Sequence, residues 1–215
     1  MTIENLAVFD LDNTLIDSDK KLRMDIVNAM KLLGHELSPE EVSGDWYTLA
    51  RGYGVSKAQF DWALDRRKSW ARSLEDEEVG LFEDTVPCLE GIKEGGVGLA
   101  LLSRSIPDYT YQKLRHFGLE KYFKAVETVH PKTQSKREGA IKIVKSFYPK
   151  GLNKAYFLGD REEDVIIAED VSLELGIKTE GIWVNRTAKP ITDSLRRYQQ
   201  VSSLENVPAL ILGRS

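Results

Sequence analysis

Two acidic motifs hold the side chains best able to do chemistry in this chain of 215 residues. Asp10 and Asp12 follow the apolar run Leu-Ala-Val-Phe, while Asp160 and Asp164 follow the run Ala-Tyr-Phe-Leu and a glycine. Clustered carboxylates repel one another and need a cation or shared protons. Carboxylate oxygens without His or Cys ligands favour Mg²⁺ over zinc. The two motifs therefore predict a magnesium site, provided that the fold brings them together.

A hydroxyl and a lysine add a second kind of chemistry. Ser103 and Arg104 follow another apolar run, and Lys136 stands at the start of a predicted helix. A hydroxyl, an ammonium group and loop amides beside a divalent cation make a site for a phosphate dianion. An aspartate can attack phosphorus to form an aspartyl phosphate, and a second carboxyl two residues along can move the leaving-group proton. These residue types predict phosphoryl transfer.

The apolar pattern predicts how these groups are positioned. From about residue 84 onward, short apolar runs alternate with segments of helical spacing, which predicts an α/β Rossmann-like parallel sheet flanked by helices. Ligands bind at the carboxyl ends of the strands in such sheets, where the polar groups stand. The predicted strands are 6–9, 97–102, 125–129, 155–158 and 181–184.

An all-helical segment separates the first motif from the second predicted strand. Its first helix ends at Gly34, and capping patterns at Ser38 and Ser56 open two more, the former expected to run through Trp46. We therefore expect an inserted helical cap. The predicted domains are a core of residues 1–16 and 85–215 and a cap of residues 17–84. Three tryptophans at helical spacing are interpreted as core of the cap: Trp46, Trp62 and Trp70.

Composition excludes several classes of protein. With 34 acidic and 30 basic residues the net charge is −4, which gives no electrostatic case for nucleic-acid binding. A single cysteine, Cys88, excludes an intramolecular disulfide and fits a reducing compartment. No apolar run approaches the ~18 residues of a membrane span, and the first residues lack a signal-peptide pattern. We expect a cytoplasmic protein without a membrane segment.

The motifs together resemble those of the haloacid dehalogenase (HAD) superfamily, in its phosphatase branch with a helical C1 cap. The first motif, DxDxT, is matched from Asp10, and the second, a Ser or Thr ending a strand, by Ser103. Lys136 matches the third motif, and GDxxxD is matched around Asp160. The motifs span the chain in order, and phosphoglycolate-phosphatase-like enzymes share this layout.

The resemblance implies a role for each acidic residue. Asp10 would be the nucleophile and a Mg²⁺ ligand, and Asp12 the general acid and base, giving its backbone carbonyl to the metal. Asp160 and Asp164 would be further metal ligands. We also expect nearby carboxylates to help Asp12 hold a proton.

The resemblance also implies a phosphate-binding set. Ser103 and Lys136 would hold the transferring phosphoryl group, and the backbone amide of Arg104 would add a donor. Lys132, four residues before Lys136, stays open as the alternative lysine, because family lysines vary in position around this helix start.

The implied function is Mg²⁺-dependent hydrolysis of a small phosphorylated metabolite, because a cap of this size can hardly enclose a macromolecule. A phosphomutase of the same superfamily, a receiver-like phospho-aspartate signalling module and an inactive scaffold stay open as alternatives. The dehalogenase branch does not keep the second aspartate, so Asp12 argues against it. The sequence leaves open whether the protein is a monomer or a homodimer.

Overall fold

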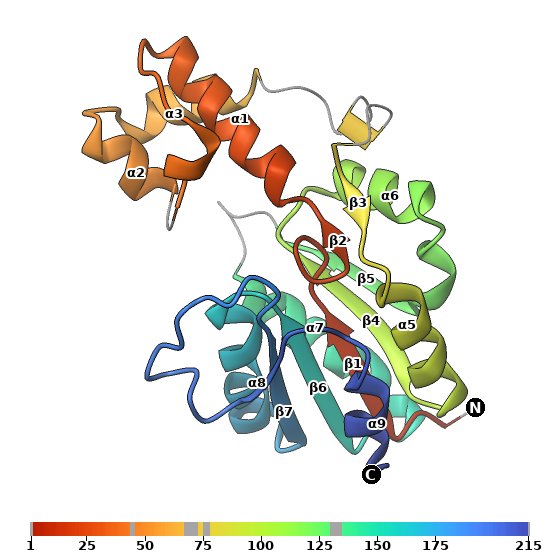
Figure 1. Cartoon of the computed structure of the whole chain (residues 1–215). Coiled ribbons are helices and arrows are strands. Elements are labelled where there is room, and N and C mark those ends of the chain that lie inside the picture. The colour runs from red at the N-terminus through yellow and green to blue at the C-terminus, as the bar shows by residue number, and fades with distance from the viewer. Residues whose placement is uncertain (1, 44–45, 67–72, 75–77, 130–134, 215) are drawn as a thin grey trace. The chain divides into compact units, whose positions relative to one another are not determined.

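The computed structural model divides the chain into two compact units, Met1–Ile16 with Leu81–Ser215 (the core unit) and Asp17–Gly80 (the cap unit) (Figure 1). The chain passes between them at β2 (Ile16–Asp17) and β3 (Gly80–Leu81), which pair as a two-stranded sheet. The structure describes residues 2–43, 46–66, 73–74, 78–129 and 135–214.

The core unit is built on a parallel sheet of six strands in the order β5-β4-β1-β6-β7-β8. The chain leaves the central strand β1 for β4 and β5 on one side and later fills the other side, so that strand order reverses beside β1. In such sheets the ligand lies outside the carboxyl ends at that reversal. The strands are β1 Asn5–Phe9, β4 Gly98–Ser103, β5 Ala125–Thr128, β6 Lys154–Gly159, β7 Lys178–Val184 and β8 Gln199–Val201.

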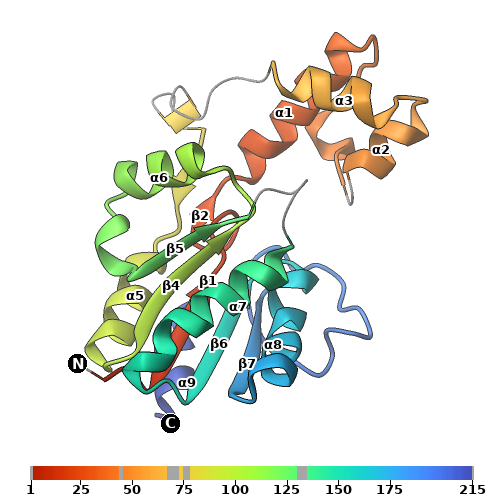
Figure 2. The ribbon, with the colours of Figure 1, turned by 180° about the vertical axis from the view of Figure 1, so that it is seen from behind.

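Helices cover both faces of this sheet, which confirms the predicted α/β fold. Helices α7 and α8 pack together on one face, and α5 and α9 pack on the other (Figure 2). Buried side chains such as Leu6 and Val8 of β1 join Ile143 and Val144 of α7 in one apolar cluster. Burying each such side chain contributes about 1.5–3 kcal/mol. The helices are α5 Thr85–Glu94, α6 Pro107–His116, α7 Lys136–Phe147, α8 Glu162–Leu175 and α9 Val207–Leu212, with single 3₁₀ turns at Glu120–Tyr122 and Tyr148–Lys150.

The cap unit has an apolar core of its own. Its described helices are α1 Asp19–Leu32, the 3₁₀ turn η1 Pro39–Glu41, α2 Trp46–Gly52 and α3 Lys57–Leu64. Ile26 and Met30 of α1 pack with Phe60 of α3. Trp46 packs partly buried against this cluster, whereas Trp62 is 48% exposed with the Arg66 guanidinium over its ring. The interpretation of Trp62 as core was therefore wrong, and Trp70 lies outside the described residues.

The helix expected from Ser38 through Trp46 is divided, and the reason is tertiary. The capping box at Ser38 forms as expected, but it opens only the single turn η1. The Arg23 guanidinium donates hydrogen bonds to the carbonyls of Pro39 and Val42, which a continuing helix would have used. Val42 is buried, in an extended conformation.

Residues 81–84, placed at the end of the cap from the sequence, lie in the core unit. The Phe82 amide donates to the Leu15 carbonyl at 3.4 Å. Asp84 forms two hydrogen bonds with the Arg186 guanidinium, at 2.7 and 2.9 Å, and accepts one from the Leu204 amide. These contacts fix the chain to the core just before α5 begins.

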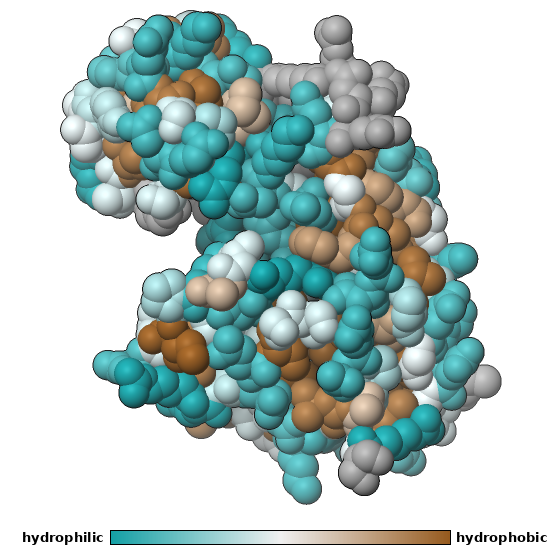
Figure 3. All heavy atoms as spheres, in the orientation of Figure 1, coloured by the Kyte–Doolittle hydropathy of each residue, from teal (hydrophilic) through white to brown (hydrophobic). Residues whose placement is uncertain are grey.

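Polar side chains dominate the visible surface of both units, with apolar side chains in separate groups (Figure 3). Within the described part of the chain, no helix combines the length and apolar character that crossing a membrane requires.

Candidate active site

The first acidic motif folds into a tight turn at the end of β1. The Asn13 amide donates to the Ile16 carbonyl at 2.7 Å, and the amides of Leu15 and Ile16 both donate to the Leu11 carbonyl. Asn13 has φ 63°, a left-handed conformation that Asn adopts more readily than most side chains. The turn holds Asp10 and Asp12 at the carboxyl edge of the sheet, next to the central strand.

Lys136 joins the two acidic motifs. Its ammonium Nζ lies 2.5 Å from Asp10 Oδ1 and 2.5 Å from Asp164 Oδ1. Lys136 is the first residue of α7, which starts at a capping box formed by Ser135 and Glu138. The helix start thereby delivers a buried cation between two carboxylates from different strand ends. Lys132, the alternative, lies outside the described residues.

Asp164 is held by its place in the first turn of α8. Its Oδ2 accepts the backbone amide of Arg161 at 3.0 Å, so both carboxylate oxygens have partners. A Cβ at Gly159 would lie 2.2–2.4 Å from the Asp164 side chain, closer than real atoms approach. Only glycine at the end of β6 therefore lets this carboxylate reach the site.

Three carboxylates offer oxygens that lie within 4.8 Å of one another: those of Asp10, Asp160 and Asp164. Lys189 adds a second cation, with Nζ 2.8 Å from Asp160 Oδ2. The Arg161 guanidinium is a third positive group, and it interacts electrostatically with all three carboxylates. Oxygen donors at this spacing fit a hard divalent cation such as Mg²⁺.

The electrostatics of this cluster favour adding positive charge. Burial raises the pKa of Asp10 to about 7; the Lys136 ammonium opposes the rise, and the Asp164 and Asp160 carboxylates add to it. Burial, together with Asp164, also raises the pKa of Asp160, against the effect of Lys189. Although burial disfavours its charge, Lys136 keeps a pKa above its usual value because Asp10 and Asp164 lie beside it. A bound divalent cation would hold these carboxylates in the ionised form.

Asp12 lies in a different environment from Asp10. The Lys113 ammonium contacts both Asp12 oxygens, at 2.8 and 2.7 Å, and the Ser105 hydroxyl donates to Oδ2 at 2.9 Å. The expectation that neighbouring carboxylates help Asp12 hold a proton stays a prediction, and the structure adds a lysine in contact with this carboxyl. The sequence analysis missed both partners. For Lys113 the sequence did hold a signal, because this lysine stands between Thr110 and Leu114 on the apolar side of a predicted helix.

The second motif lies where the sequence placed it, at the end of β4. Ser103 is buried, and its Oγ accepts the backbone amide of Ser105 at 3.1 Å. The side chain of Arg104 turns to the surface and pairs with Glu163 at 3.0 Å. The backbone amide of Arg104, rather than its guanidinium, thus stays the candidate donor for a phosphate.

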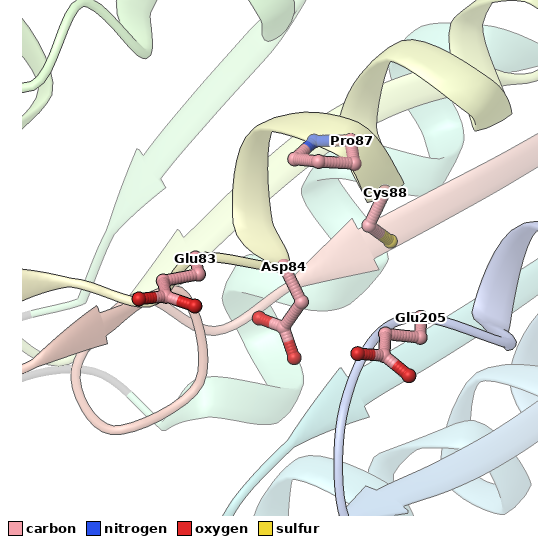
Figure 4. A pocket seen from close by; sticks show the side chains of 5 residues that line it. All are labelled: Glu83, Asp84, Pro87, Cys88 and Glu205. Carbon is pink, nitrogen blue, oxygen red and sulfur yellow. The ribbon is translucent and has the colours of Figure 1, made fainter.

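A hollow of about 210 Å³ elsewhere on the core unit shares none of these residues (Figure 4). It is lined by Glu83, Asp84, Pro87, Cys88 and Glu205. Burial raises the pKa of the Cys88 thiol to about 12, so the thiol stays protonated and is a poor nucleophile. Cys88 is buried and packs as a small apolar residue.

Comparisons with known proteins place the chain in a family. A family model for haloacid dehalogenase-like hydrolases matches residues 7–177. The pyrophosphatase PpaX of Bacillus velezensis is 24% identical, across 95% of this chain and 93% of that protein.

A HAD phosphatase structure from Thermococcus onnurineus has a TM-score of 0.66 at 23% identity, covering 98% of this chain and 99% of that one. Protein Tyrosine Kinase A of Mycobacterium tuberculosis has a TM-score of 0.69 at 21% identity and 98% coverage of both chains, so the fold alone does not decide the reaction. The family match over most of the length shows that the chain belongs to the haloacid dehalogenase-like hydrolases.

Proposed function

We propose that this enzyme is a Mg²⁺-dependent phosphatase that acts on a small phosphorylated metabolite through an aspartyl phosphate. The observation that carries the proposal is the cluster of Asp10, Asp160 and Asp164, in which the Lys136 ammonium contacts Asp10 and Asp164. It combines a nucleophilic carboxylate, a cation for the phosphoryl oxygens and oxygen donors for a metal in one place.

The roles follow from the chemistry of phosphoryl transfer. Asp10 attacks phosphorus in line, and the bond to the leaving oxygen breaks as the bond to the Asp10 oxygen forms. Asp12, which lies beside Lys113, first takes up a proton from solvent and then gives this proton to the leaving oxygen. Asp12 then takes a proton from the water that attacks the aspartyl phosphate, which releases phosphate and returns Asp10 as a carboxylate. Positioning and charge neutralisation account for most of the rate enhancement in such reactions.

The residues that would hold the metal are Asp10, Asp160 and Asp164, with the backbone carbonyl of Asp12. Bound there, Mg²⁺ would neutralise charge on the phosphoryl oxygens. Lys136 and Ser103, with the Arg104 amide, would hold the remaining oxygens.

The substrate class is a small phosphate ester or pyrophosphate. The PpaX relative carries the name of a pyrophosphatase, and its similarity extends over nearly the whole chain. In pyrophosphate the leaving group is itself a phosphate, so the same residues serve both reactions. We propose the helical cap as the part that selects the leaving group.

The test is phosphate release by the purified protein from p-nitrophenyl phosphate, a panel of sugar and carboxylate phosphate esters, and pyrophosphate, with Mg²⁺ present. We expect turnover on at least one substrate and a loss of about 10⁴-fold or more in kcat for Asp10→Asn, because the nucleophile is removed. The matched control is Asp193→Asn, since the Asp193 side chain is 95% exposed and forms a surface ion pair with Arg196. Absence of release by the wild type, or equal rates for Asp10→Asn, would overturn the proposal.

A further inference from the structure

Lys113 is a fully buried lysine in a position that suits an apolar side chain. It lies on α6 between Thr110 and Leu114, all of them buried, and its own exposed fraction is 0%. Removing an ammonium group from water costs several kcal/mol unless nearby acceptors compensate for it. A leucine or methionine would pack here without that cost, so the lysine needs a reason other than the packing of α6.

The Lys113 ammonium contacts both oxygens of one carboxylate and a hydroxyl that binds the same carboxylate. Its Nζ lies 2.8 Å from Asp12 Oδ1, 2.7 Å from Asp12 Oδ2 and 3.3 Å from Ser105 Oγ. The Ser105 hydroxyl in turn donates to Asp12 Oδ2. The Ser105 backbone is itself fixed, because its amide donates to Ser103 Oγ and its carbonyl accepts from Thr110 Oγ1. A carboxylate held at both oxygens by two groups has little freedom to rotate.

We infer that Lys113 is the positioning residue for Asp12: it fixes the direction of the Asp12 carboxyl so that this group, and not the Asp10 cluster, faces the leaving oxygen. The inference rests on the proposed function. It assigns each aspartate of the first motif its own buried lysine, Lys136 for Asp10 and Lys113 for Asp12. Lys113 does not touch the transferring phosphoryl group in this scheme. It acts only through Asp12.

This assignment predicts a defect that depends on the leaving group. Nitrophenolate leaves without much help from an acid, whereas an alkoxide needs its proton during bond cleavage. Lys113→Met should therefore lower kcat about 100-fold for alkyl phosphates, within the range typical of general-acid catalysis, and far less for p-nitrophenyl phosphate. KM should change less than about threefold, because Lys136 and Ser103 still bind the phosphate. The control is Lys142→Met, a surface lysine of α7 that is 68% exposed.

A double-mutant cycle separates positioning from a structural role. When Lys113→Met is added to Asp12→Asn, we expect less than about a threefold further loss, because Lys113 acts through the carboxyl that is already missing. The inference would be overturned if Lys113→Met lowered kcat by the same factor in the wild type and in Asp12→Asn. Equal losses of kcat across the leaving-group series would also overturn it. If circular dichroism shows that Lys113→Met does not fold, the same cycle is measured with Ser105→Ala, because this substitution removes the other donor to Asp12.

A crystal structure of Lys113→Met gives a readout that does not depend on activity. We expect the Asp12 carboxylate to turn away from Ser105, and an unchanged orientation would overturn the inference even for an active enzyme. An inactive wild type would instead count against the proposed function, so the two failures are distinguishable.

Discussion

The two aspartates of the first motif lie two residues apart and have opposite surroundings. Asp10 shares Lys136 with Asp164 and lies beside Asp160, and burial with these two carboxylates raises its pKa to about 7 against the effect of Lys136. The Asp12 carboxylate contacts the Lys113 ammonium at both oxygens and accepts a hydrogen bond from the Ser105 hydroxyl. The Asp10 side therefore offers clustered oxygen donors that fit a cation, whereas the Asp12 carboxylate is held by a lysine and a hydroxyl.

Removing the metal should have the largest effect, and only on the Asp10 side. We expect EDTA to abolish phosphate release and Mg²⁺ to restore it, because the carboxylate cluster needs the added charge. Thermal unfolding gives an independent readout: Mg²⁺ at about 100 times its dissociation constant should stabilise the wild type by about 2.7 kcal/mol. Asp160→Asn should lose most of that gain, whereas Lys113→Met should keep it. Turnover that persists in EDTA would contradict the argument from the cluster.

Asp12→Asn should lower the free energy of unfolding by about 3 kcal/mol, because it leaves the Lys113 ammonium buried beside a neutral amide. Adding Lys113→Met to this variant should recover most of the loss, since the buried ammonium is then gone. Urea unfolding of the single and double variants measures both values. A double variant that is less stable than Asp12→Asn alone would contradict the described ion pair between Asp12 and Lys113.

Asp10→Asn should have the opposite effect on stability from Asp12→Asn. We expect it to raise the free energy of unfolding of the metal-free protein by about 2 kcal/mol at pH 8. The folded-state pKa of Asp10 is raised to about 7, above its ordinary value of 3.8, so its ionised form costs stability, and this cost grows as the pH rises from about 4 to 7. The gain should therefore vanish below about pH 4. Unfolding curves at several pH values in EDTA measure it, and a loss of stability at pH 8 would remove the contrast with Asp12.

A third acidic group, Asp84, provides a structural reference outside the reaction. Burial works to raise its pKa, but hydrogen bonds from Arg186 and the Leu204 amide outweigh this, and the pKa is lowered. An acidic group whose pKa is lowered in the folded state stabilises the fold at pH values above its unfolded pKa of about 3.9. This stability is lost as the pH falls through the lower pKa of the folded state.

Arg186→Met should consequently cost about 1–2 kcal/mol at pH 7 and progressively less below about pH 4. The readout is stability and not kcat, because the Arg186 guanidinium also donates two hydrogen bonds to the Thr14 carbonyl in the turn of the first motif. Lys154→Met, which removes a surface pair with Glu180, is the control for loss of an ion pair. A cost that does not depend on pH would show that packing on Phe82 and the bonds to Thr14, rather than the charge pair, explain the effect.

The sequence predicted the parts of the molecule that depend on local pattern. Buried strands such as β4 and β6 and the start of α7 at Lys136 follow from apolar runs and a capping box. Strand β8, a short edge strand of sequence Gln-Gln-Val, has no apolar run and was missed. The break after η1 depends on Arg23, a residue distant in sequence, and no local pattern reports it.

The same limit applies to the site. Asp10, Asp160 and Asp164 were predicted to meet because parallel strands bring their carboxyl ends together, and the structure places them in one cluster. Lys113 reaches Asp12 from 101 positions away. Its role depends on how α6 packs against the end of β1, which the spacing of apolar residues does not specify.

The most direct test of the account is to trap the phosphoryl group on the enzyme. Asp12→Asn, mixed with ³²P-labelled substrate and quenched in acid, should carry label as an acyl phosphate, because water attack is slowed once the base is gone. Borohydride reduction followed by peptide mapping should place the label on Asp10. Label on another residue would contradict the proposed aspartyl phosphate on Asp10. Turnover with no acyl phosphate in either the wild type or Asp12→Asn would contradict it as well.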